Sequence, residues 1–90
     1  MGSQSNIEII ITVCCTVPKM TLIIEPWADE IELIKGDRVQ LIGRGPKTEH
    51  GFAVEIVGDS LVVFGWTHSI VIATKNGERL TTASSQIPSL

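Results

Sequence analysis

The stretch EIELIKGDRVQL, residues 30–41, contains two short runs in which apolar and polar side chains alternate, separated by a Gly-Asp pair. Alternation at every second residue places the apolar side chains on one face of an extended strand, whereas a helix would need a period of 3.6 residues. Glycine and aspartate are typical of tight turns because they accept the backbone angles that a reversal requires. We therefore predict two β-strands joined by a short connection.

The same period of two recurs on both sides of this stretch, in runs rich in Ile, Val and Thr. These runs are residues 7–13, 20–24, 52–57 and 70–75. Branched β-carbons fit a pleated sheet and are crowded in a helix. Gly58-Asp59 and Asn76-Gly77 separate further strand pairs, and Asn-Gly is typical of a type I′ hairpin. We predict an all-β fold of seven or eight short strands in an antiparallel meander, forming a small barrel or a two-sheet, jelly-roll-like sandwich.

Length, charge and cysteines limit the organisation of the chain and its partners. Ninety residues correspond to one domain, which we place at residues 1–83, followed by a polar C-terminal tail at 84–90. The seven Lys and Arg residues are scattered and the net charge is −3, so we expect no nucleic-acid partner. The apolar run 9–15 is far shorter than the ~20 residues that cross a membrane, so we expect no membrane partner. Adjacent Cys14 and Cys15 should point to opposite strand faces, which argues against a disulfide and for a reduced, cytoplasmic protein.

Apolar side chains also occupy the strand faces opposite the periodic ones. Five of them are Ile10, Ile23, Val62, Phe64 and Val71. A soluble monomer rarely exposes an apolar patch of several hundred Å², so a domain this small needs a second molecule to cover part of that surface. We therefore predict that these five residues mediate self-association, with a homodimer favoured. The protein is then a non-catalytic binding or assembly module, and an unidentified protein is the alternative partner.

Trp27 and Trp66 support an alternative hypothesis, because each falls at the end of a predicted strand. In a structural interpretation the two rings cover one end of the fold, since an indole buries a large apolar area and keeps one N–H donor. In a functional interpretation they flank a cleft in which a small cationic ligand or a carbohydrate stacks. Glu25, Asp29 and His68 would then supply polar contacts. A pocket that contains both rings would favour this ligand-binding β-barrel, and burial of both rings would oppose it.

The spacing of the reactive residues does not indicate a catalytic or metal site. His68 and Ser69 are adjacent, so their side chains would point to opposite faces, and no G-x-S-x-G elbow is present. A metal needs three or four converging ligands, but the His and Cys residues lack H-x-H and C-x-x-C spacing. We expect no enzymatic activity and no cofactor. A metal or hydrolytic enzyme would need His50, His68 or Cys14 beside carboxylates.

Residues 22–80 resemble a pattern shared by short uncharacterised bacterial proteins. The match consists of Glu25-Pro26-Trp27 with acids following, an alternating strand before Gly36-Asp37, and Phe64-Gly65-Trp66 before a final hairpin. The pattern has Gly, Pro and Pro-Gly where this sequence has Ala28, Lys35 and Thr67-His68. The resemblance implies a bacterial β-protein of unknown role and brings no catalytic residues with it.

A weaker resemblance, through residues 32–39, is to the glycine turn of cupin jelly rolls. The metal-binding histidines of cupins have no counterpart in this sequence. A cupin-like metal enzyme is therefore the least supported of the alternatives.

Overall fold

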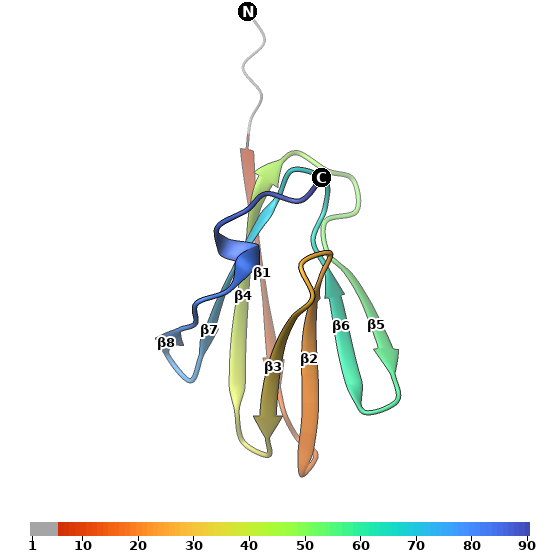
Figure 1. The fold of residues 1–90 in the computed structure, drawn as a ribbon, viewed down its shortest axis with the longest axis vertical. Helices are drawn as coiled ribbons and strands as arrows, with labels where there is room; N and C mark the ends of the chain where they lie inside the picture. Colours follow the sequence, from red (N-terminus) through yellow and green to blue (C-terminus); the bar gives the residue numbers. More distant parts are fainter. Residues whose placement is uncertain (1–5) are drawn as a thin grey trace, which may run out of the picture.

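Eight β-strands and one short 3₁₀ helix make up the computed structural model, which describes residues 6–90 and confirms the predicted all-β class (Figure 1). Residues 1–5, the start of the predicted domain, lie outside the described residues. The strands are β1 (Asn6–Cys14), β2 (Lys19–Glu25), β3 (Asp29–Ile34), β4 (Arg38–Pro46), β5 (Ala53–Val57), β6 (Ser60–Phe64), β7 (Ile70–Lys75) and β8 (Glu78–Arg79). The helix, η1 (Ala83–Ser85), follows the last strand.

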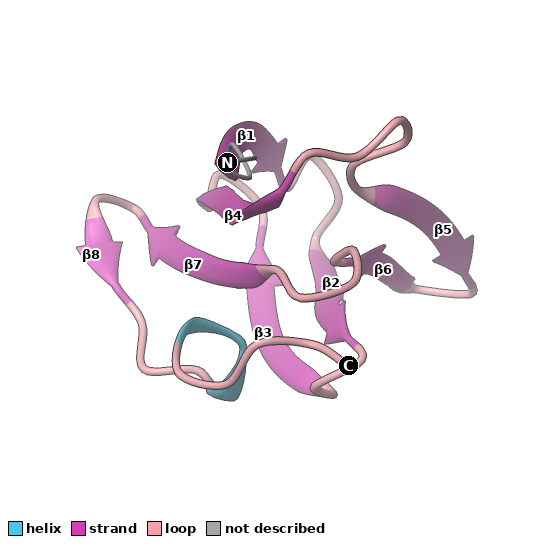
Figure 2. Cartoon of the chain, turned by 90° about the horizontal axis from the view of Figure 1, so that it is seen from above, coloured by secondary structure: helices cyan, strands magenta, loops and turns pink. Residues whose placement is uncertain are grey.

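The strands form two four-stranded sheets that pack face to face as a sandwich. Sheet A has the order β1-β4-β7-β8, and sheet B has the order β3-β2-β6-β5. The sheets are not closed into a barrel, because β1 ends sheet A and β5 ends sheet B. Figure 2 shows the two sheets diverging on this side of the molecule. Of the two predicted architectures, the structure is therefore the sandwich.

The strand pairing is less local than the predicted meander. Within residues 6–90, hairpins between consecutive strands join only β2 to β3, β5 to β6 and β7 to β8. The β2–β6 pair is parallel, whereas the other pairs are antiparallel. The difference begins at Gly36-Asp37, where the chain passes from β3 in sheet B to β4 in sheet A. This turn is a crossing between layers and not a hairpin, so β2 pairs its second edge with a strand much later in the chain.

Gly58-Asp59 and Asn76-Gly77 form the two hairpin turns expected from their sequence. Asn76 and Gly77 have φ angles of 50° and 85°, both positive as a type I′ turn requires. The Asn76 side chain also accepts the backbone N–H of Arg38 (2.9 Å) and donates to the Asp37 carboxylate (2.9 Å). The hairpin turn is thereby tied to the layer crossing at the same end of sheet A.

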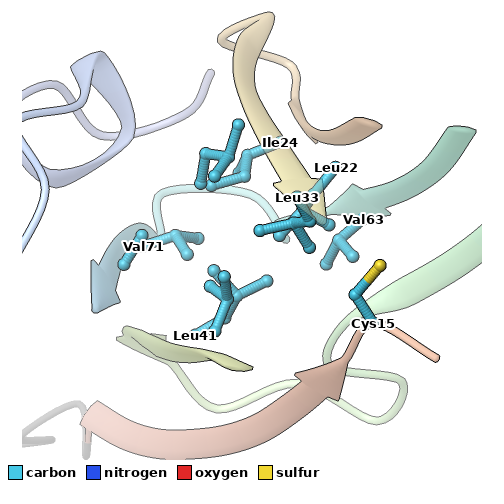
Figure 3. Packing of buried hydrophobic residues seen from close by; sticks show 10 residues of the cluster. Cys15, Leu22, Ile24, Leu33, Leu41, Val63 and Val71 are labelled. Atoms are coloured by element: carbon cyan, nitrogen blue, oxygen red, sulfur yellow. The ribbon is translucent and has the colours of Figure 1, made fainter. Parts of the chain in front are cut away.

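The core lies between the sheets and consists of inward side chains from the central strands. Fully buried members include Leu22, Ile24, Leu33, Leu41 and Val63 (Figure 3). In β2, β3 and β4 the buried apolar residues are those that the two-residue period predicts. The alternation of apolar and polar residues in these three strands therefore correctly indicates which face of each strand is buried.

The inner face of β7 differs from the sequence prediction. Val71 and Ala73 point into the core and are fully buried, whereas the period favours Ile70 and Ile72. Ile72 is buried too, at 8% exposure, on the opposite face of the strand. When both faces are apolar, a period of two does not say which one is inside. Val71 is therefore a core residue and is not available for the self-association predicted for it.

The C-terminal strap, residues 81–90, closes one side of the sandwich. Figure 2 shows η1 between β8 and β3, the edge strands of that side. The Asp29 carboxylate accepts the backbone N–H groups of Ala83 (3.1 Å) and Ser84 (2.9 Å), and the Ser84 hydroxyl donates to the Val71 carbonyl (2.8 Å). Ser84 and Ser89, which fall in the segment expected as a polar tail, are buried. On the opposite side, between β1 and β5, no described helix or strand covers the gap, and the β4–β5 connection contacts β1 where a Cβ at Gly51 would lie 2.6 Å from an Ile9 side-chain atom.

Candidate functional site: the open side of the sandwich

The open side is the gap between the edge strands β1 and β5, and its most unusual residues belong to β5. Val54 pairs with Val63 and Ile56 pairs with Leu61. Residues directly opposite each other in an antiparallel pair share a face, and Val63 is fully buried in the core, so Val54 and Ile56 point inward. They are nevertheless 56% and 78% exposed. The reason is that sheet A ends at β1, and no described strand lies opposite β5 (Figure 2).

A groove of about 590 Å³ lies where the open side meets the connection between β1 and β2. Its walls are the end of β1, the residues leading into β2, and the β5–β6 hairpin. Most of the side chains that line it are apolar, among them Met20, Ile56 and Leu61. Lys19 and Asp59 are its charged members. The groove therefore offers an apolar contact surface with one positive and one negative group.

Strand β1 forms the other border of the open side, and its outer edge is unpaired within residues 6–90. Soluble proteins usually protect such an edge with Lys, Pro, a bulge or a covering segment. The nine residues of β1 include neither Lys nor Pro, and their register with β4 is continuous. Glu8 is the charged residue of the strand and lies 3.8 Å from Arg44, both side chains being about half exposed. The β1 edge is therefore suited to lie beside another strand.

The residues predicted for self-association do not share one surface. Ile10 is 53% exposed and lies on the outer face of sheet A. Ile23 and Val62 are neighbours in the β2–β6 register and lie half-buried on the outer face of sheet B, with Phe64 on the same face. Val71 is in the core. The structure therefore divides the predicted residues between two outer faces and the interior.

Trp66, one of the two predicted ligand-stacking residues, is buried at the end of the sandwich. Its indole N–H donates to the Pro46 carbonyl (2.8 Å), and its ring meets Phe52 edge-on with ring centroids 5.4 Å apart. A Cβ added at Gly43 would lie 2.7 Å from a Trp66 ring atom, and one at Gly45 would lie 3.1 Å from the indole nitrogen. The ring therefore fills space that two strand glycines leave free, which is a structural role.

Trp27 packs at the same end of the sandwich, against the C-terminal strap. Its indole N–H donates to the Ile87 carbonyl (2.6 Å), and its ring lies 2.8 Å from the position that a Cβ on Gly65 would take. The two tryptophans are thus brought to one end by the fold, as expected. Their indole N–H donors are already used by carbonyls of the chain.

Of the polar residues in the ligand-binding hypothesis, Asp29 has a carboxylate that is bonded within the chain, whereas Glu25 and His68 form backbone hydrogen bonds. The Asp29 carboxylate accepts two backbone N–H groups of the C-terminal strap. Glu25 is half-buried, and its carbonyl accepts the Gly65 N–H (2.9 Å). His68 is exposed in the turn between β6 and β7, with φ of 66°, and its backbone N–H donates to the Ser89 carbonyl (3.0 Å). The side chains of Asp29, Trp27 and Trp66 therefore hold this end of the molecule together.

The cysteines lie as the sequence predicts, with Cys14 exposed and Cys15 buried. Among residues 6–90, no three His, Cys, Asp or Glu side chains gather closely enough to hold a metal ion. In the same part of the chain, no helix is long and apolar enough to cross a membrane.

Sequence reasoning missed the open side because the exposure of β5 depends on how the two sheets are offset. The sequence of β5 carries no local signal of this exposure: Val54 and Ile56 alternate with the charged Glu55, as in a strand with one buried and one solvated face.

The comparisons with known proteins do not identify the chain. No protein-family model, no curated protein and no solved structure matches it. The resemblance to short bacterial β-proteins therefore stays a prediction.

Proposed function

We propose that this protein is a non-catalytic assembly module that associates with a second copy of itself through the open side of the sandwich. The observation that carries the proposal is the exposure of Ile56. This side chain points toward the inner face of its sheet, yet 78% of it is exposed. Covering one isoleucine side chain contributes about 1.5–3 kcal/mol. Val54 beside it and the apolar wall of the groove add to this driving force.

The chemical character of the open side supports contact with protein. The groove has mainly aliphatic side chains, and its two charged groups have opposite signs. Apolar cores with a few peripheral charges are typical of protein interfaces. The ligand-stacking alternative has less support, because the Trp66 ring is buried and both indole N–H groups have carbonyl partners in the chain.

The cellular setting is also part of the proposal. Cys14 and Cys15 are free thiols, and small domains of oxidising compartments commonly depend on disulfides. We therefore assign the protein to the cytoplasm, and the sequence pattern of residues 22–80 favours a bacterial source.

Sedimentation equilibrium across the micromolar range tests the self-association. We expect a species of twice the 9.8 kDa chain mass. Ile56→Lys should convert it to a monomer, because a lysine ammonium in an apolar contact would lose its hydration. The matched control is Val57→Lys, at a neighbouring residue of β5 that is 54% exposed but points to the outer face. A wild-type protein that stays at 9.8 kDa throughout this range would contradict the proposal.

A further inference from the structure

The C-terminal strap, residues 81–90, is held to the sandwich by hydrogen bonds and not by apolar packing of its own side chains. Its buried residues are polar, namely Thr82, Ser84 and Ser89. Its isoleucine and its leucine, Ile87 and Leu90, are 61% and 103% exposed. A segment with few buried apolar contacts opens at a lower free energy than a packed core does. The strap can therefore leave the sandwich without exposing a buried apolar side chain of its own.

A hinge lies where the strap begins. Leu80 packs against the core and its N–H donates to the Ala73 carbonyl (2.9 Å), so it belongs to the sandwich. Thr81, the next residue, is exposed. Beyond this residue the strap bonds to itself, because the Ser85 hydroxyl donates to the Thr82 carbonyl (3.0 Å). The first half of the strap can therefore move as one piece about Thr81.

The first set of hydrogen bonds between strap and sandwich lies at η1. The Asp29 carboxylate accepts the backbone N–H groups of Ala83 and Ser84. These two bonds use main-chain atoms of the strap, so they do not depend on the identity of its side chains. The Ser84 hydroxyl adds a bond to the Val71 carbonyl (2.8 Å), which favours a small hydroxyl residue at this position.

The second set of hydrogen bonds lies at the β6–β7 turn. Ser89 pairs with this turn as adjacent strands do, because its N–H donates to the Ser69 carbonyl (2.9 Å) and its carbonyl accepts the His68 N–H (3.0 Å). The Trp27 indole donates to the Ile87 carbonyl (2.6 Å). These three bonds also use main-chain atoms of the strap. The surface beneath the strap therefore recognises an extended polypeptide backbone, the chemistry by which sheet edges bind peptides.

We propose that the strap is an autoinhibitory cover, which detaches as one unit about Thr81 and uncovers a site for an extended segment of another protein. In the closed state the strap occupies this site itself, and opening frees the Asp29 carboxylate and the Trp27 indole N–H together. The site lies on the side of β3 and β8, away from the open side (Figure 2), so the proposal does not depend on self-association. A partner segment binds only open molecules, so its apparent Kd rises as the open fraction falls.

Peptide binding to a variant with a detached strap tests the site. Ser84 is fully buried, so Ser84→Lys would remove an ammonium group from water in the closed state and should hold the strap open. The probe is a fluorescent peptide with the unchanged sequence of residues 81–90, followed by anisotropy. It should bind the Ser84→Lys chain at least about tenfold more tightly than the wild type, because more molecules are open. Ala83→Lys, at an exposed neighbouring position, is the control of equal charge and should bind the peptide as the wild type does.

The same experiment shows whether the peptide occupies the place of the strap. A peptide that carries Ser89→Pro lacks the N–H that bonds to the Ser69 carbonyl, so it should bind the Ser84→Lys chain more weakly than the unchanged peptide. Equal affinity of the unchanged peptide for the Ser84→Lys and Ala83→Lys chains would overturn the proposed site. Circular dichroism melts check that both variants keep the fold.

Hydrogen exchange of the full chain tests whether the strap detaches as one unit. The amides of Ser84 and Ser89, one from each set of bonds, should share one protection factor, at least about a hundredfold below that of the amides of β4. Asp29→Ala removes only the first set, yet it should accelerate both amides by the same factor. Acceleration of the Ser84 amide alone would show that the two sets open separately. Protection equal to that of β4 would show that the strap opens only when the domain unfolds, and either result would overturn the hinge.

Discussion

At the residue scale, Asp37 shows how one carboxylate connects two turns that are distant in sequence. It accepts the backbone N–H of Ile34 (2.9 Å) and the side-chain amide of Asn76 (2.9 Å), and it lies 3.7 Å from the Lys75 ammonium. The Ile34 hydrogen bond first, and then the Asn76 bond, lower the pKa of Asp37 below its usual value of 3.8. These bonds favour the ionised carboxylate in the folded state.

The lowered pKa of Asp37 predicts an acid dependence of stability. The folded state holds this proton less tightly than the unfolded state, so the contribution is complete above pH ~4, the unfolded pKa. It is lost as the pH falls below that value through the lower pKa of the folded state. Urea titrations from pH 7 to pH 2.5 should show a smaller loss of unfolding free energy for Asp37→Asn than for the wild type. Parallel curves for the two proteins would contradict this role.

At the scale of elements, the sequence predicts the strands well but not their partners. The alternation of residues 30–41 and the Asn76-Gly77 turn give β3, β4 and the β7–β8 hairpin, because these depend on neighbouring residues. The parallel pairing of β2 with β6 joins Leu22 to Leu61, and no local pattern encodes that choice. The inner face of β7 was unpredictable for a related reason, since Val71 and Ile72 are both buried.

The C-terminal strap illustrates an element that composition alone hides. Ser84-Ser85-Gln86 is polar and suggests a free tail, yet the strap carries two buried serines and hydrogen bonds to Asp29 and Trp27. Its order depends on a carboxylate in β3 that is far away in sequence. Sequence reasoning identified Asp29 and Trp27 as notable residues and left a structural and a ligand-binding interpretation open, and in the structure both contact the strap.

The attachment of the strap predicts a specific loss of stability. Asp29→Ala removes the acceptor of two backbone N–H groups and should lower the unfolding free energy by about 1–3 kcal/mol. Hydrogen exchange of the Ala83 and Ser84 amides should accelerate. Glu30→Ala, at the exposed neighbouring position, is the matched control and should change stability by less than about 0.5 kcal/mol. An unchanged exchange rate at both amides would show that the strap does not depend on Asp29.

At the scale of the whole molecule, the excess of apolar residues predicts an interface, and the fold determines its proposed place. The sequence analysis placed it on the outer strand faces, through Ile10, Ile23, Val62, Phe64 and Val71. In the structure the exposed apolar side chain is instead Ile56, which faces inward, is 78% exposed and is assigned to the core by alternation alone. Only the offset of the sheets reveals that this position is uncovered, and an offset of layers has no signature in a single sequence.

Self-association also predicts how heat stability depends on protein concentration. The Tm of the wild type should rise with concentration, because a dimer of folded chains draws the equilibrium away from the unfolded state. The Ile56→Lys variant should still fold, because residue 56 is 78% exposed in the monomer. As a monomer it should have a Tm that does not depend on protein concentration. Calorimetric scans over a hundredfold range of concentration measure both slopes. Equal slopes would mean that the open side is not the contact.

The parallel pairing of β2 with β6 has a consequence for how the chain is made on the ribosome. Strand β2 ends at Glu25 and β6 begins at Ser60, so a nascent chain has synthesised β2 and β3 well before the strand that completes their sheet. At about 5–20 residues per second, this interval lasts seconds. Leu22 and Ile24, fully buried in the finished protein, therefore cannot reach their final packing until β6 has been made. The sheet that contains β2 can therefore be completed only after residues 60–64 have been synthesised, late in a chain of 90 residues.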